Sequence, residues 1–127
     1  MAHPNDRKYS NEHEWVLVDG DVATIGITSF AQDQLGEVVY VDLPDAGDTI
    51  TAGDTFGEIE SVKSVSELFA PVTGEILEVN DGLADTPETV NKDPHDAGWM
   101  IKVKLDDASE YDGLMSAEEY DDFVTQG

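Results

Sequence analysis

Lysine is the scarce reactive residue of this chain, and one lysine has an unusual setting. The 127 residues include six Lys and Arg against 29 Asp and Glu. Lys63 lies between Val62 and Ser64, at the expected tip of a hairpin where its ammonium projects into water. Such a tip does not desolvate an amine, so it does not supply the low pKa that a Schiff-base or general-base lysine needs. Covalent modification suits an exposed amine best, although an ordinary surface lysine is the simpler interpretation.

The other four lysines have ordinary explanations. Lys8 falls in the N-terminal segment and Lys92 in a long polar connection, whereas Lys102 and Lys104 alternate with apolar residues on the solvated face of a strand. None of them is a candidate for chemistry.

No other segment carries a catalytic or metal-binding pattern. The chain has no Gly-rich phosphate loop, no nucleophile elbow and no cysteine, so any redox chemistry has to be imported. Its histidines, His3, His13 and His95, are far apart in sequence and predict no metal site. His13, close to Trp15, is interpreted as a packing or turn residue. We therefore expect neither a catalytic residue nor a bound metal.

The charge balance limits the possible partners and compartments. A net charge of -23 argues against nucleic acid and anionic membranes, because both require clustered Lys and Arg. The acids are scattered over nearly every turn and strand edge, which is typical of a halophilic cytoplasmic protein, with an ordinary acidic protein as the alternative. There is no apolar leader and no run of about 18 apolar residues, so we expect a cytoplasmic protein. We also expect a monomer.

The elements that must position Lys63 are mostly strands. Residues 14–18 and 22–28 flank an Asp-Gly turn and predict a hairpin. Ser29 is expected to cap a short helix that ends at Gly36, and residues 37–43 and 75–79 are expected to be strands. In residues 55–69 the apolar spacing would also fit a helix, but β-branched residues, serines and a glycine favour two strands that meet near Lys63.

The second half of the chain predicts a long irregular connection, a strand and a helix. Residues 80–98 are rich in Asp, Asn, Pro and Gly. Residues 99–105 alternate, with Met100 expected on the solvated face, and Ser116 and Glu119 have the spacing of a helix capping box. We predict one domain over residues 1–127, mainly β with short peripheral helices and a C-terminal helix, and a flexible tail at residues 1–8.

A series of short segments also resembles one known family, in order and with few length changes, across residues 7–124. They are residues 9–16 (YSNEHEWV), 26–32 (GITSFAQ), 35–37 (LGE), 43–44 (LP), 60–68 (ESVKSVSEL), 70–75 (APVTGE), 78–80 (EVN), 90–91 (VN), 93–94 (DP) and 98–102 (GWMIK). Together they are similar to the glycine cleavage H-proteins. Residues 60–68 resemble the lipoyl-lysine segment of that family.

This resemblance implies a fold and a carrier function. The implied fold is a flattened β-barrel or sandwich of the biotinyl/lipoyl carrier type, with Lys63 on a tight hairpin and a lipoyl group on its amine. The implied partners are a pyridoxal-phosphate glycine decarboxylase, a tetrahydrofolate-dependent aminomethyltransferase, dihydrolipoyl dehydrogenase and a lipoylating enzyme. The lipoyl arm would shuttle the aminomethyl group of glycine between them, so the protein itself is not an enzyme. The resemblance also places Glu14 and Glu67 in the cleft that receives the arm.

Three positions depart from the family pattern. Gln34 stands where many members have His, Glu12 where a smaller residue is usual, and Ser64 where Ala is frequent. The first two bear on the arm cleft, because one removes a histidine and the other adds a negative charge.

Rival interpretations remain open at this stage. A biotinyl domain usually has methionines beside its lysine, and the simpler lipoyl domains of 2-oxo acid dehydrogenases lack the N-terminal and Trp99 segments. An H-like protein could pass lipoyl groups to other complexes instead. From other classes, an unmodified acidic interaction module, or an enzyme that uses Glu14 and Glu67, would leave Lys63 unmodified.

Overall fold

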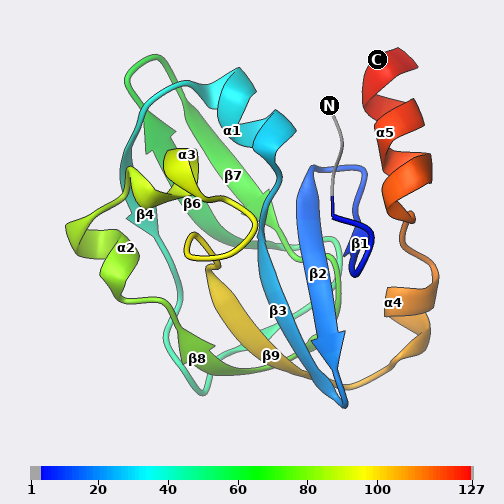
Figure 1. Cartoon of the computed structure of the whole chain (residues 1–127). Helices are drawn as coiled ribbons and strands as arrows, with labels where there is room; N and C mark the ends of the chain where they lie inside the picture. Colours follow the sequence, from blue (N-terminus) through cyan, green and yellow to red (C-terminus); the bar gives the residue numbers. More distant parts are fainter. Residues whose placement is uncertain (1–3, 127) are drawn as a thin grey trace.

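Two antiparallel sheets build the protein, as the computed structural model shows for residues 4–126 (Figure 1). The larger has six strands in the order β1-β2-β3-β9-β8-β5, and the smaller has three in the order β4-β6-β7. The strands are β1 Lys8–Tyr9, β2 Glu14–Asp19, β3 Val22–Ile27, β4 Val38–Asp42, β5 Thr49–Ile50, β6 Thr55–Ser61, β7 Val65–Phe69, β8 Gly74–Val79 and β9 Ile101–Leu105. The helices are α1 Ser29–Leu35, α2 Gly82–Asp85, α3 Thr89–Lys92, α4 Ser109–Asp112 and α5 Ala117–Gln126.

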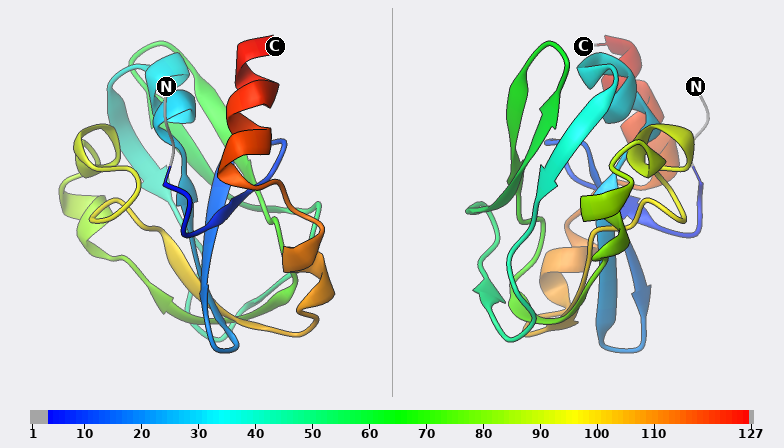
Figure 2. Two further views of the ribbon diagram at one scale, coloured as in Figure 1. Left: turned by 45° about the vertical axis from the view of Figure 1, so that its right-hand side comes forward. Right: turned by 90° about the vertical axis from the view of Figure 1, so that its left-hand side faces the viewer.

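The main core fills the space between the two sheets. Ile25, Val103 and Ile76 of the larger sheet and Ile59 and Leu68 of the smaller one belong to one cluster of buried side chains. This arrangement, with short helices around the sheets and a C-terminal helix, confirms the predicted mainly β fold (Figure 2). Among residues 4–126, the helices are all too short or too polar to cross a membrane.

Local turn and cap signals account for several elements. β2 and β3 form the predicted hairpin, with Asp19 opposite Val22 and Gly20 at a φ of 68° in the turn between them. The strand prediction for residues 55–69 is also confirmed, because β6 and β7 pair antiparallel on either side of Lys63. Ser116 and Glu119 form the expected capping box of α5, each donating its backbone N–H to the side chain of the other.

Three local expectations need correction. Helix α1 is capped by Thr28, whose Oγ1 accepts the Ala31 N–H at 3.1 Å, whereas Ser29 is the first helical residue. Residues 80–98 contain the short helices α2 and α3. Met100 is fully buried rather than solvated, because the strand alternation begins one residue later, at Ile101. The Met100 N–H instead donates to the Ile25 carbonyl at 2.8 Å, at the end of the β3–β9 ladder.

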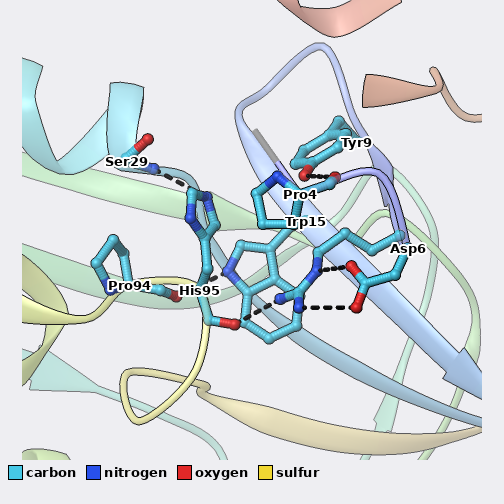
Figure 3. A network of polar contacts seen from close by, with 8 residues as sticks. Pro4, Asp6, Tyr9, Trp15, Ser29, Pro94 and His95 are labelled. Carbon is cyan, nitrogen blue, oxygen red and sulfur yellow. Dashed lines mark hydrogen bonds and ion pairs between the residues drawn. The ribbon is translucent and has the colours of Figure 1, made fainter. Parts of the chain in front are cut away.

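The N-terminal segment is tied to the body of the protein (Figure 3). Residues 1–3 lie outside the described residues, so the predicted tail can be followed only from residue 4. Arg7 donates to the His95 carbonyl and lies over the Trp15 ring at 4.7 Å. The Trp15 indole N–H donates to the Pro94 carbonyl at 2.8 Å, and Lys8 opens β1. These contacts join Arg7 and Trp15 to residues 94–95. The flexibility expected for residues 1–8 stays a prediction.

Candidate functional site

Lys63 lies at the tip of the β6–β7 hairpin, and Ser61 closes that tip. The Ser61 N–H donates to the Ser64 carbonyl at 2.8 Å. The Ser61 Oγ accepts the Lys63 N–H at 3.3 Å and the Ser64 N–H at 3.2 Å. These bonds fix the backbone of the turn, so the position of the Lys63 Cα is set even though its side chain is exposed.

The segment between α1 and β4 supports the hairpin tip from below (Figure 1). The Val62 N–H donates to the Glu37 carbonyl at 3.0 Å. Gly36, at a φ of 81°, leaves room for the lysine side chain, because a Cβ placed there would come within 3.0 Å of the Lys63 Cε. The lysine stem therefore passes over the Gly36 backbone.

Asn91 holds this support in place. Its side-chain N–H groups donate to the Gly36 carbonyl at 2.8 Å and to Gln32 Oε1 at 2.9 Å, and its Oδ1 accepts the Val38 N–H at 2.8 Å. Because residues 36 and 38 are bound to one side chain, the Glu37 carbonyl between them faces Val62 in a fixed position.

A cavity of about 490 Å³ opens beside the two sheets and α1. Its walls come from β2, β3, α1, β6 and β7, and they are mostly apolar. The lining residues are Glu12, His13, Glu14, Ile27, Phe30, Ala31, Gln34, Leu35, Ile59, Ser66, Glu67, Leu68 and Phe69. The cavity and the lysine share the β6–β7 hairpin, although Lys63 is not among the residues that line the cavity.

Glu14 is the buried acid of this cavity. It is 2% exposed, and its Oε1 accepts the Ser10 hydroxyl at 2.5 Å. Burial raises the pKa of the Glu14 carboxyl to about 8, while hydrogen bonds from Ser10 and from the Phe69 backbone act in the opposite direction. The carboxyl is therefore mainly neutral at pH 7, and a cation placed beside it would favour its ionisation.

Glu67 is in a different environment from Glu14. It stands directly opposite Glu58 in the β6–β7 ladder, and its Oε2 accepts the Thr55 hydroxyl at 3.3 Å. The neighbouring residues Ser66 and Leu68 alternate with it across the sheet, so the Glu67 carboxylate belongs to the exposed face while its strand lines the cavity.

Two of the three positions that depart from the family pattern also reach the cavity. Glu12 and Gln34 both line it. His13 lines it as well, at a φ of 70°, with its Nδ1 2.7 Å from the Tyr120 hydroxyl and its ring against Phe30. The interpretation of His13 as a turn and packing residue is confirmed. Within residues 4–126 no group of His, Asp and Glu is arranged to hold a metal, and His3 lies outside that range.

Sequence reasoning missed three residues that shape the site. Ser10 holds the Glu14 carboxyl, Asn91 holds the support of the tip, and Gly36 was interpreted only as the end of a helix. Ser10 and Asn91 do fall inside the segments that resemble the family, which is the one signal that could have identified them. Their spacing alone carries no such signal.

Comparison with known proteins gives consistent results. The family model described as Glycine cleavage H-protein matches residues 7–127. The chain is 55% identical over 124 residues to the glycine cleavage system H protein of Staphylococcus saprophyticus, and 53% identical to that of Staphylococcus haemolyticus, covering 98% of each protein and of this chain. The crystal structure of a glycine cleavage system H protein from Mycobacterium marinum superposes with a TM-score of 0.86 at 39% identity, covering 98% of both chains. These relatives give no support to a halophilic origin.

Proposed function

The chain belongs to the glycine cleavage H-protein family, and on that premise we propose that Lys63 is the residue that carries the lipoyl group of this family. The protein functions as a lipoyl-bearing carrier in glycine cleavage, a carrier subunit rather than an enzyme in itself. The observation that carries the assignment to Lys63 is its exposed amine on a turn whose backbone is closed by Ser61.

The residues around Lys63 fit a lipoyl group. An amide bond to its Nζ would add a long apolar chain, and the adjoining cavity has an apolar wall that includes Ile27, Leu35 and Ile59. When attached, the lipoyl group would supply the pair of sulfurs that this cysteine-free chain lacks. The chain contributes a nucleophilic amine, a fixed turn and a mostly apolar cavity.

Glu14 is proposed to receive an amine carried on the end of the arm. A buried carboxyl that becomes ionised beside a cationic amine accepts a charge-assisted hydrogen bond, which is stronger than a neutral one. The Ser10 hydroxyl donates to the Glu14 carboxyl and fixes its orientation. Glu67, hydrogen-bonded to Thr55 on the exposed face, would act only near the attachment end of the arm.

Family membership implies interaction with the enzymes of the glycine cleavage system. We propose that these are the glycine decarboxylase, the aminomethyltransferase and dihydrolipoyl dehydrogenase, with a lipoylating enzyme that loads Lys63. A tethered arm presents its end to each of them at a high effective concentration, provided that it reaches their active sites. A single domain, a monomer and a cytoplasmic location remain our predictions.

Intact-mass analysis of the native protein tests the assignment. Wild type should carry one lipoyl addition, and Lys63→Arg should carry none, because guanidinium stays protonated and cannot attack an activated carboxyl. Lys92→Arg is the matched control, since it changes another lysine and should keep the addition. A lipoylated Lys63→Arg protein, or wild type modified at Lys92 or Lys102 instead, would overturn the proposal.

A further inference from the structure

The C-terminal helix reaches the wall of the cavity proposed for the arm through one side chain. Tyr120 of α5 is fully buried, and its ring stacks on that of Tyr9 with 4.8 Å between the ring centroids. The ring belongs to a second cluster of buried side chains, formed by β1, β2 and α5 (Figure 1). The hydroxyl points out of that cluster, because it lies 2.7 Å from His13 Nδ1 and 2.8 Å from Thr28 Oγ1.

His13 has an unusual backbone conformation. Among residues 4–126 it is the one non-glycine residue with a positive φ, 70°. This conformation costs free energy for a residue with a Cβ, and it persists where the surroundings impose it. Here the surroundings are the Tyr120 hydroxyl and the rings of Phe30 and Phe123, whose centroids lie 5.0 and 5.9 Å from that of His13. The Thr28 N–H also donates to the His13 carbonyl at 3.1 Å, so the start of α1 and α5 both hold this residue.

A turn of residues 10–14, from here on called the His13 turn, connects His13 to Glu14. The Ser10 carbonyl accepts the His13 N–H at 3.2 Å, and the Ser10 N–H donates to the Glu14 carbonyl at 2.9 Å. The Ser10 Oγ accepts the Glu14 N–H at 3.2 Å and donates to Glu14 Oε1 at 2.5 Å. Because Ser10 binds His13 and both the backbone and the carboxyl of Glu14, a displacement of His13 would also displace the Glu14 carboxyl.

Packing alone does not account for the Tyr120 hydroxyl. A phenylalanine ring would fill the same space in the second cluster, whereas a buried hydroxyl needs hydrogen-bond partners. Both of its partners belong to the wall of the cavity. His13 lines the cavity directly, and Thr28 caps α1, whose residues Phe30 and Ala31 line it. The hydroxyl therefore joins the two segments that flank the cavity.

We infer that Tyr120 is a positioning residue for the arm: its hydroxyl holds the His13 turn and the start of α1 in place and thereby sets the position of the Glu14 carboxyl. The inference rests on the proposed function, because Glu14 is the residue proposed to receive the amine. Within the described part of the chain no residue of α5 lines the cavity, so Tyr120 acts through His13 and Thr28. A carboxyl that is already held in position need not be ordered when the amine arrives.

Urea unfolding of the unlipoylated protein at pH 5 and pH 9 tests the positioning role without the arm. The proteins compared are wild type, Glu14→Gln, Tyr120→Phe and the double variant. The gain in urea midpoint caused by Glu14→Gln should grow from pH 5 to pH 9 in the wild-type background. It should grow less in the Tyr120→Phe background, because a loosened turn hydrates the Glu14 carboxyl and returns its pKa towards the ordinary value.

This comparison separates positioning from a general loss of stability. A purely structural role of the Tyr120 hydroxyl would lower the midpoints of both members of the pair and leave the pH-dependent gain unchanged. Burial raises the pKa of Tyr120 to about 12, so the hydroxyl stays neutral from pH 5 to pH 9. The other ionisable groups that line the cavity are common to all four proteins; they are Glu12, His13 and Glu67.

The rate at which the loaded carrier loses its aminomethyl group provides a second measurement. Tyr120→Phe should speed this loss about fivefold, a change within the range expected for one hydrogen bond. The same substitution should add nothing further in the Glu14→Gln background, because the carboxyl that it positions is already gone. Tyr111→Phe is the matched control and should behave like wild type in both measurements, since it removes a tyrosine hydroxyl from α4, whose ring packs against the main core.

His13→Asn is a second variant that should reproduce Tyr120→Phe. Asparagine tolerates a positive φ, so it removes the ring with little added backbone strain, and it carries the same comparison if Tyr120→Phe does not fold. A pH-dependent gain that is the same in the Tyr120→Phe and wild-type backgrounds would overturn the inference, as would a Tyr111→Phe protein altered as much as Tyr120→Phe. Unchanged aminomethyl loss in Glu14→Gln would instead contradict the proposed role of Glu14, while the unfolding measurement still decides the role of Tyr120.

Discussion

Glu14 should make the stability of the protein depend on pH, and Glu14→Gln should remove that dependence. Burial raises the pKa of the folded carboxyl from 4.5 to about 8. In the unfolded chain the carboxyl is hydrated and ionises near its ordinary pKa. Between these two values the folded state holds a proton that the unfolded state has released. The unfolding free energy therefore falls as the pH rises through that range.

The size of this effect follows from the pKa difference. At about 1.4 kcal/mol per pH unit, raising the carboxyl pKa from 4.5 to about 8 corresponds to a loss on the order of 5 kcal/mol between pH 4 and pH 9. That is a large fraction of the stability of an ordinary domain. Glutamine keeps the shape of the side chain and an oxygen that can accept the Ser10 hydroxyl, but it has no charge to bury.

Urea unfolding at pH 5, 7 and 9 in 1 M KCl measures the effect. The difference between Glu14→Gln and wild type should move in favour of the variant by several kcal/mol from pH 5 to pH 9. Histidine titration is common to both proteins and cancels in that difference. Glu75→Gln, at an exposed position of β8, controls for the loss of one carboxylate. A difference that is constant from pH 5 to pH 9 would refute the reasoning.

Three further predictions concern the surface, the support of the tip and the arm. With a net charge of -23, the thermal midpoint should rise steeply from dilute buffer to molar KCl, and calorimetry that finds a flat midpoint would contradict this. Gly36→Ala should destabilise the fold by about 1–3 kcal/mol, because φ 81° and ψ -154° lie in a region essentially restricted to Gly. It should also slow lipoylation of Lys63, followed by mass spectrometry. Gly47→Ala, also at positive φ but with nothing near its Cβ, should only destabilise. Glu14→Gln should speed non-enzymatic loss of the aminomethyl group without preventing lipoylation, and unchanged decay would count against the arm cleft.

The parts of the fold that the sequence predicts correctly are those governed by neighbouring residues. Gly20 between two β-branched runs is enough to indicate the β2–β3 hairpin, and Ser116 with Glu119 is enough to indicate the start of α5. The prediction that Met100 is solvated was wrong because neighbouring residues do not decide its place. Its place depends on where the β3–β9 ladder ends, which is a contact between residues 75 positions apart and leaves no mark on the local alternation.

The sequence directs attention to Lys63 but not to the residues that surround it. Residues 60–68 identify Lys63 through family resemblance, and the resemblance also names Glu14. The burial of Glu14, however, depends on Ser10, Phe69 and the packing of β2 against the smaller sheet. A glutamate pKa near 8 is a property of that enclosure, so no count of acidic residues could have revealed it.

The cross-strand pairs of carboxylates in the smaller sheet could not be predicted from the sequence, for a further reason. The sequence shows 29 acids scattered along the chain, and scatter suggests a uniformly solvated surface. Cross-strand register decides which of them meet, and a shift of one residue would move every side chain of a strand to the other face. The bulge at Val39 sets that register, because it lets Tyr40 pair with Glu60 and so brings Asp42 opposite Glu58. A bulge beside Lys63 therefore creates a cross-strand pairing of like charges that the composition of the chain does not reveal.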